Sequence, residues 1–200
     1  MKATVLIDNI SNNGLQAEWG LAINIEYKDN IFLLDAGTTG IFADNAKELG
    51  VDLSKVKYAA LSHAHYDHAD GFEAFFEQNK YAKLYIREGS GENCYHRHNR
   101  IFHRYRYIGI KKGMLDKYSD RIVYAGGDYP LCEGVALIGH KTKGLDEIGK
   151  TSSMYVKMGR KYRPDDYAHE QSLVFETEKG LVVFNSCSHG GIDNIIREVQ

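Results

Sequence analysis

The sequence lacks the features that would place it at a membrane or on nucleic acid. No apolar run approaches the roughly 20 residues that a membrane-spanning helix needs. The first apolar run meets Asp8 almost at once and has neither the apolar core nor the cleavage site of a signal peptide. The formal net charge is only -2, which gives no overall signature of binding to nucleic acid or lipid.

Cysteine is scarce as well, and Cys94, Cys132 and Cys187 lie far apart. An odd number of widely spaced cysteines argues against a disulfide framework and fits a reducing compartment. No internal repeat, low-complexity tract or clear linker divides the chain. With 43% hydrophobic residues, a chain of 200 residues can bury a core of its own. We therefore expect one soluble, cytoplasmic domain over residues 1–200.

Short β-rich runs alternate with helical spacings along this domain. We predict strands at residues 3–7, 21–27, 31–35, 58–62, 83–86, 121–124, 135–139, 173–176 and 181–185. Helices are predicted at residues 41–49, 71–79 and 192–199. The polar residues 141–166 are predicted to form a long mobile loop. This order predicts an α/β fold, in which chemistry commonly lies at the carboxyl ends of strands.

A cluster of metal-binding side chains follows the predicted strand at residues 58–62. It consists of His63, His65, Asp67 and His68. Imidazole and carboxylate groups suit zinc, manganese or iron. His63 and His65 can face one ion, while Asp67 and His68 can reach a second ion about 3.5–4 Å from the first. Solvated histidines in a loop are the alternative, but this spacing after an apolar strand favours two divalent transition-metal ions, with zinc preferred.

Further ligands must come from elsewhere, because a metal site needs at least three protein ligands. His189 occupies a glycine-rich turn after an apolar strand, and we expect it to bind metal. His169 and His140 also lie next to strands, where a hydrogen-bonding role competes with ligation. Cys187 is either a small buried residue or a ligand. Asp35 either orients a ligand histidine without binding the metal itself, or caps its own turn.

A basic segment interrupts the otherwise neutral chain. Residues 87–106 contain five arginines and three histidines, against two glutamates and no aspartate. Arginine binds carboxylate and phosphate groups in bidentate fashion. We therefore predict that a basic and aromatic insert at about residues 87–120 forms a lid over a small anionic substrate, with Arg97, Arg100, Arg104 and Tyr105 as its candidate binding residues. A solvated or self-paired loop is equally compatible, whereas the neutral overall charge disfavours nucleic acid.

The segment His63-Ala64-His65-Tyr66-Asp67-His68 resembles the His-x-His-x-Asp-His motif of the metallo-β-lactamase superfamily. The surrounding sequence resembles one subgroup, the archaeal dihydropterin–aminobenzene phosphate synthase-like proteins. That likeness is carried by Leu6-Ile7-Asp8-Asn9, Glu18-Trp19-Gly20-Leu21, Phe32-Leu33-Leu34-Asp35-Ala36-Gly37, Leu61-Ser62-His63, Glu170-Gln171-Ser172-Leu173 and Cys187-Ser188-His189-Gly190-Gly191-Ile192-Asp193-Asn194-Ile195-Ile196. The resemblance covers nearly the whole chain and implies a four-layer αββα sandwich with the metals between its two sheets.

The same resemblance implies a division of the ligands. His63, His65 and His189 would hold the first metal, and Asp67 and His68 the second, with Asp67 also assisting proton transfer as a catalytic residue. Family members continue through further strands that supply a late histidine to the second metal. Because this sequence ends at Gln200, we expect a C-terminally truncated sandwich, an incomplete second site, and an exposed edge or face that favours a homodimer.

Three functions remain open from the sequence. The first is a binuclear hydrolase that uses metal-activated water on a small anionic ester, amide or phosphoester. The second is a non-catalytic or degenerate metal- or ligand-binding domain with an incomplete second site. The third, suggested by the resemblance, is a transferase that acts on a pterin-like phosphorylated substrate.

Overall fold

The computed structural model describes residues 1–11, 14–99 and 104–200. Its strands are β1 (Lys2–Ile7), β2 (Ala22–Tyr27), β3 (Asn30–Leu34), β4 (Tyr58–Ala60), β5 (Lys83–Arg87), β6 (Cys94–Asn99), β7 (Arg104–Tyr107), β8 (Ile122–Ala125), β9 (Tyr129–Cys132), β10 (Val135–Gly139), β11 (Met154–Met158), β12 (Lys161–Pro164), β13 (Gln171–Thr177) and β14 (Gly180–Phe184). The α-helices are α1 (Ile41–Glu48), α2 (Tyr66–Ala69), α3 (Phe72–Gln78), α4 (Met114–Lys117), α5 (Asp146–Thr151) and α6 (Ile192–Val199).

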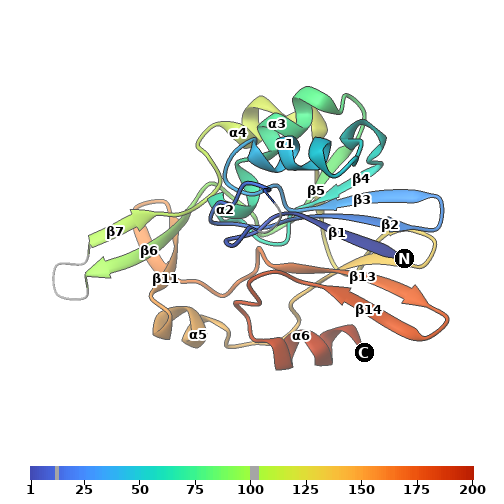
Figure 1. The fold of residues 1–200 in the computed structure, drawn as a ribbon. Helices are drawn as coiled ribbons and strands as arrows, with labels where there is room; N and C mark the ends of the chain where they lie inside the picture. The colour runs from blue at the N-terminus through green and yellow to red at the C-terminus, as the bar shows by residue number, and fades with distance from the viewer. Residues whose placement is uncertain (12–13, 100–103) are drawn as a thin grey trace.

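Two sheets and their covering helices form four layers. The first sheet has the order β1-β2-β3-β4-β5-β8, and the second has the order β14-β13-β10-β9. Helices α1, α3 and α4 cover one face of the first sheet, the second sheet lies on its other side, and α6 runs along the outer side of the second sheet (Figure 1). The predicted αββα sandwich is thereby confirmed. No helix within the described ranges is long and apolar enough to cross a membrane.

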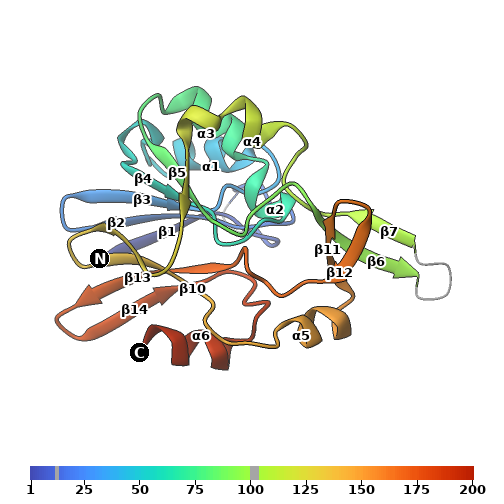
Figure 2. The same ribbon diagram turned by 180° about the vertical axis from the view of Figure 1, so that it is seen from behind.

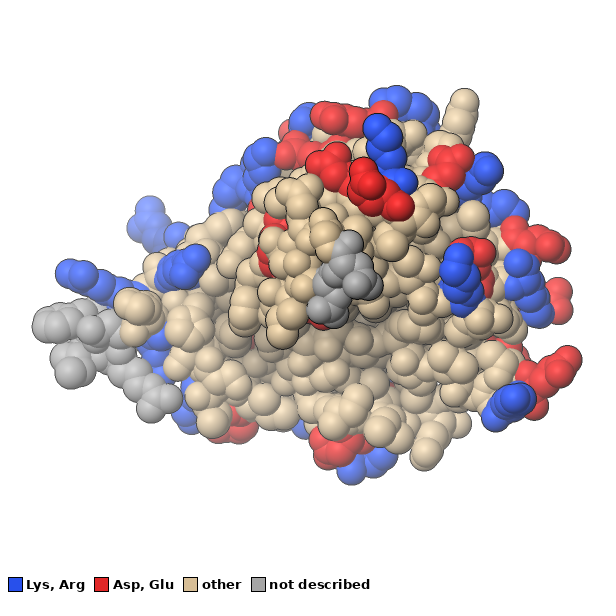
Figure 3. Space-filling view, in the orientation of Figure 1, with Lys and Arg blue, Asp and Glu red and all other residues tan. Residues whose placement is uncertain are grey.

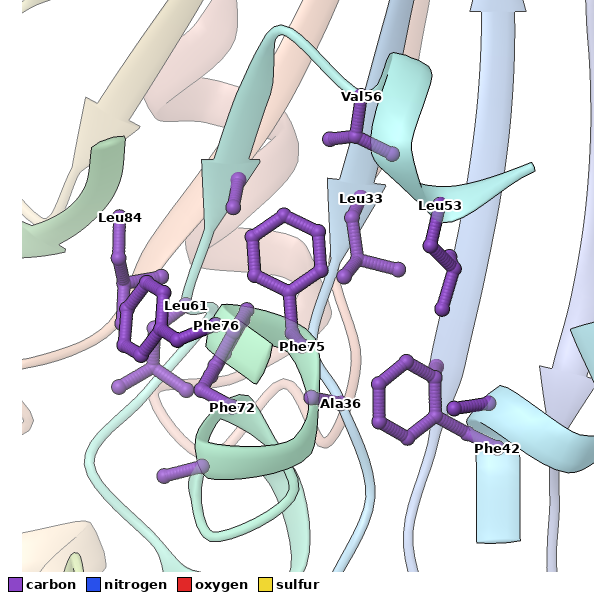
Figure 4. Close-up of a cluster of buried hydrophobic side chains, with 14 of the residues drawn as sticks. Leu33, Ala36, Phe42, Leu53, Val56, Leu61, Phe72, Phe75, Phe76 and Leu84 are labelled. Carbon is purple, nitrogen blue, oxygen red and sulfur yellow. The ribbon is translucent and has the colours of Figure 1, made fainter. Parts of the chain in front are cut away.

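Strand β3 separates the two halves of the core. Because side chains alternate across a strand, Leu33 faces the helical layer while Phe32 and Leu34 face the second sheet. On the helical side, Leu33 packs among buried aromatic residues that include Phe42 and Phe75 (Figure 4). On the other side, Phe32 meets Phe175 of β13 edge to face, with 5.2 Å between ring centroids. The sandwich is therefore held together by apolar packing on both faces of one strand.

A third sheet stands beside the sandwich and has the order β12-β11-β6-β7. It projects to one side in both ribbon views (Figures 1 and 2). The prediction of a long mobile loop at residues 141–166 is wrong, because this segment forms α5, β11 and β12. The described part of the basic segment contributes β6 and β7, so it is more than the solvated loop offered as an alternative. These strands form through pairing between distant segments, such as Cys94 with Val156, which local patterns do not reveal.

The loops that follow β3, β4 and β14 meet at one edge of the sandwich. Gln171, at the start of β13, connects the two sheets there. Its backbone N–H donates to the carbonyl of Ser62 at 2.8 Å, and its side-chain amide donates to the carbonyl of Leu61 at 2.9 Å. This edge brings residues 61–68 next to residues 186–191.

Replacing Phe75 with alanine tests the packing of the helical layer. Phe75 is fully buried, and removing such a ring costs lost burial and leaves a cavity, for a loss of about 3–5 kcal/mol in the free energy of unfolding. Urea denaturation measures the loss. Tyr81→Ala is the control, because that side chain is 87% exposed and should change stability by less than about 0.5 kcal/mol. Equal stability of the two variants would contradict the core described above.

Candidate metal centre

Four histidines from both halves of the chain converge at this edge. His63 and His65 follow β4, His68 lies in α2, and His189 follows β14. The ring centroid of His63 is 4.3 Å from that of His68, 4.6 Å from that of His65 and 4.8 Å from that of His189. The rings of His65 and His189 are also 4.8 Å apart. The structure therefore brings together residues that are more than 100 positions apart in the sequence.

Three nitrogens in this cluster have no hydrogen-bond partner among the described residues. They are the buried Nε2 atoms of His63, His65 and His189. Leaving a buried polar atom unpaired costs about 1–3 kcal/mol, and the centroids of these three rings lie 4.6–4.8 Å apart, so the three atoms call for partners. A divalent transition-metal ion fits them, because neutral imidazole is its preferred nitrogen ligand.

The protonation state of His63 and His65 also suits the binding of a metal ion. Burial lowers the pKa of His63 and His65 well below its usual value, and the neighbouring imidazoles lower it further. Both rings are therefore neutral, which is the form that binds metal.

Asp35 organises the opposite side of the cluster. Its Oδ1 accepts from the backbone N–H of Ser62 at 2.7 Å, and its Oδ2 accepts from the Ser62 hydroxyl at 2.7 Å and is 2.8 Å from Nδ1 of His68. Burial lowers the pKa of His68, but the Asp35 carboxylate outweighs it and raises that pKa to about 10. Asp35 thereby holds Nδ1 of His68, while Nε2 of the same ring lies 3.3 Å from Sγ of Cys187 and 3.6 Å from Oδ2 of Asp67.

Other polar contacts fix the loop that carries His189. Glu170 accepts hydrogen bonds from the backbone N–H groups of His189 and Gly190, each at 2.8 Å. The ring of Tyr167 stacks on that of His189 with 5.4 Å between centroids and an interplanar angle of 8°. A Cβ at Gly190 would lie 2.3 Å from Nε2 of His140, so only glycine fits there.

His140 and His169 both use their ring nitrogens in hydrogen bonds, although the ring of His169 lies 5.5 Å from that of His65 and its ligand atoms group with those of His65, Cys94 and Asp165. The two ring nitrogens of His140 contact Glu170 at 2.7 Å and Glu198 at 2.8 Å. His169 accepts at Nδ1 from the N–H of Ala64 at 3.2 Å, and its Nε2 is 3.0 Å from Asp165. These contacts support the alternative, hydrogen-bonding role for both residues. The sequence reasoning missed Glu170, Asp165 and Ser62, although Glu170 and Ser62 lie within the motifs quoted above.

A pocket of about 380 Å³ opens in front of the histidines. Its lining includes His65, Asp67, His68, Cys187 and His189 on the metal side, apolar walls from Trp19, Leu21, Ile108 and Met154, and the basic residues His96 and Arg106. The third sheet supplies the basic residues, because its strands β6 and β7 place His96 directly opposite Arg106. Basic side chains also gather at the end of the molecule where these strands project (Figure 3).

The basic residues singled out from the sequence lie elsewhere. The Arg97 guanidinium sits 4.7 Å from the centroid of the Tyr155 ring, and Tyr105 stacks on Tyr162 with 3.8 Å between centroids. Strand register places Arg97 and Tyr105 opposite each other, on the face away from His96. Arg104 is exposed and does not line the pocket, and Arg100 lies outside the described residues.

Known proteins resemble the chain over nearly its whole length. Two relatives come from Methanocaldococcus jannaschii. An uncharacterized protein is 26% identical over 199 residues, covering 96% of this chain and 71% of the relative. The 7,8-dihydropterin-6-methyl-4-(beta-D-ribofuranosyl)-aminobenzene-5'-phosphate synthase is 24% identical over 199 residues, covering 94% of this chain and 67% of the relative.

A solved structure gives the same picture. The crystal structure of a metal-dependent hydrolase of the beta-lactamase superfamily has a TM-score of 0.74 and 25% identity, covering 98% of this chain and 70% of that protein. The sequence profile of the metallo-beta-lactamase superfamily matches residues 20–177. With that match and with the four-layer sandwich, the chain belongs to the metallo-beta-lactamase superfamily.

Proposed function

We propose that the chain is a metal-dependent hydrolase that acts on a small anionic ester, amide or phosphoester. The observation that carries this proposal is the set of three buried, unpartnered Nε2 atoms on His63, His65 and His189. Two of these histidines, His65 and His189, also line a pocket large enough for a small molecule.

In this proposal the two ions have separate ligands. His63, His65 and His189 hold the first ion, while Asp67 and His68 hold the second. Zinc is the preferred ion, with manganese or iron as alternatives, because imidazole and carboxylate suit all three. The hydrogen bonds from His63 to Ser62 and from His68 to Asp35 fix the ring orientations, as partners behind metal ligands commonly do.

The chain's own groups then position the reactants. When bound, the ions supply Lewis acidity that makes water a nucleophile near neutral pH and polarises the substrate. The Asp67 carboxylate borders the pocket and is placed to accept a proton and return it to the leaving group. Trp19 and Met154 form apolar walls of the same pocket.

Metal analysis of the double variant His63→Ala/His65→Ala tests the proposal. We expect two ions per chain in the parent protein and loss of tight binding in the variant, because two ligands of the first ion are removed. His98→Ala is the control, since His98 is exposed on β6 and does not line the pocket. Unchanged metal content in the double variant would contradict the proposed ligands. One ion or none in the parent protein would favour the non-catalytic domain with an incomplete site.

Arg106 and His96 are the proposed contacts for the anionic part of the substrate. They lie in adjacent strands and border the same pocket as Asp67 and His68. Within the described ranges, Arg106 makes no ion pair with an acidic side chain. Its guanidinium is therefore available for a phosphate or carboxylate that is separate from the reacting bond.

Calorimetric titration of the metal-free protein with inorganic phosphate tests this assignment. Removing the ions eliminates direct phosphate–metal contacts. Arg106→Met should weaken binding by about 10-fold or more, because a hydrogen bond to a charged group contributes about 1.5–3 kcal/mol. Arg104→Met, two residues away on the same strand, should bind as the parent does. Equal losses in both variants would point to general charge rather than a specific contact.

A transferase acting on a pterin-like phosphorylated substrate is the second candidate. It is favoured by the likeness to the dihydropterin-linked synthase, which extends over 94% of this chain. This function predicts that a dihydropterin binds the metal-loaded protein and quenches the fluorescence of Trp19, the single tryptophan, which borders the pocket. If no pterin binds while simple esters or phosphoesters are hydrolysed, the transferase is contradicted.

A further inference from the structure

A second group of buried polar side chains lies next to the candidate metal centre. It consists of Cys94, Asp165 and His169, which are at most 2% exposed. Their ligand atoms lie within 4.8 Å of one another and of a ring nitrogen of His65. None of the three lines the pocket, so any part that they have in the chemistry must act through the neighbouring ligands.

His169 contacts the backbone between the first two proposed metal ligands. Its Nδ1 accepts a hydrogen bond at 3.2 Å from the N–H of Ala64, which is fully buried. A buried backbone N–H without a partner is rare and costly, and His169 satisfies this one. The carbonyl of the same peptide group, that of His63, accepts from the N–H of His65 at 3.0 Å. The peptide group that joins His63 to Ala64 is therefore held at both ends.

The other nitrogen of the His169 ring is anchored to Asp165. Nε2 lies 3.0 Å from Oδ2 of this carboxylate. Because the N–H of Ala64 points at Nδ1, that nitrogen carries a lone pair, and the proton on Nε2 is donated to Asp165. Hydrogen bonds to an ionised acceptor are stronger than those between neutral groups. This contact therefore fixes the ring in the orientation that accepts from Ala64.

Asp165 is itself held where the third sheet joins the sandwich. Its Oδ1 accepts from the N–H of Tyr167 at 2.8 Å, and its own N–H donates to the carbonyl of Met154 on β11 at 3.0 Å. A Cβ at Gly149 would lie 2.1 Å from the Asp165 carbonyl oxygen, so only glycine fits there. Asp165 thus has little freedom to move, and its contact with His169 connects the third sheet to the metal-binding loop.

The contact with Ala64 argues against an additional metal ion among these side chains. An ion bound to Nε2 of His169 would leave the ring proton on Nδ1, because a neutral imidazole carries one proton. That proton would then face the N–H of Ala64, which is another donor, instead of the acceptor that a metal-bound histidine usually has. The geometry therefore favours a hydrogen-bonded support over a further ion.

We propose that His169, held by Asp165, is a positioning residue for the first ion. It fixes the peptide group between His63 and Ala64 and thereby directs His63 and His65 toward one ion, without touching that ion itself. The inference rests on the proposed function. Removing a residue that supports a metal ligand commonly lowers metal affinity by about 10- to 100-fold, which is the size of effect expected here.

Two substitutions separate the roles of the two ring nitrogens. His169→Asn places a carbonyl oxygen near the position of Nδ1, so it keeps an acceptor for Ala64 but loses the donor to Asp165. His169→Gln places an amide N–H near the position of Nε2, so it keeps the donor but loses the acceptor. Competition with a chromophoric chelator measures the affinity of the full chain for its first equivalent of zinc. We expect His169→Gln to bind about 10- to 100-fold more weakly and His169→Asn to recover most of the affinity.

Urea denaturation of the metal-free variants separates positioning from a merely structural role. A structural role predicts that both variants lose stability and zinc affinity together. Positioning predicts that the two variants differ in zinc affinity more than in stability, and that the amide hydrogen of Ala64 exchanges faster in His169→Gln than in His169→Asn. Equal zinc affinity of His169→Gln and the parent protein, or equal losses in both variants, would overturn the positioning role.

Cobalt loading covers the remaining outcomes. A thiolate bound to Co²⁺ gives a near-ultraviolet charge-transfer absorption, so a third cobalt ion with such a band that is lost in Cys94→Ser would overturn the hydrogen-bonding role of His169. Failure of the parent protein to bind any metal would overturn the proposed function and the positioning role together. Tight zinc binding that His169→Gln leaves unchanged would overturn the positioning role alone.

Discussion

The hydrogen bonding of the Asp35 carboxylate is the constraint on which the rest of the site depends. A buried charge is costly unless it is paired and fully hydrogen-bonded, and Asp35 meets this condition through Ser62 and His68. Its φ of 58° turns the chain directly after β3, and its backbone N–H donates to the carbonyl of Ala60. One side chain thereby ties the end of β3 to the histidine segment after β4.

The cluster exists only when both sheets are packed against each other. The first sheet supplies His63, His65 and His68, whereas the second supplies His189 through the loop after β14. Gln171 and Glu170 connect these two sources through hydrogen bonds to Ser62 and His189. Packing around Phe32 and Phe175 therefore sets the distance between the ligand groups, which couples folding to any metal that binds there.

The third sheet determines what the pocket can accept. Its two faces have different roles, because side chains alternate along each strand. One face carries stacked rings such as Tyr105 on Tyr162, with Arg97 over Tyr155. The other face directs Arg106 toward the pocket. Contacts between the rings on the aromatic face stabilise these strands outside the main core. The basic face provides the proposed contact for an anion.

The sequence alone determined the α/β class, most strand positions and the cluster from His63 to His68, because alternation, apolar periodicity and a compact ligand motif are local signals. The four-layer arrangement was implied by the family resemblance. It also pointed to His189 through the turn that carries it. It could not decide which face of β6 and β7 meets the pocket, since that depends on pairing with β11, about 60 positions away. Only the tertiary structure placed Arg106 rather than Arg97 at the pocket, and Cys187 beside His68. Both outcomes depend on how distant strands and sheets pack together.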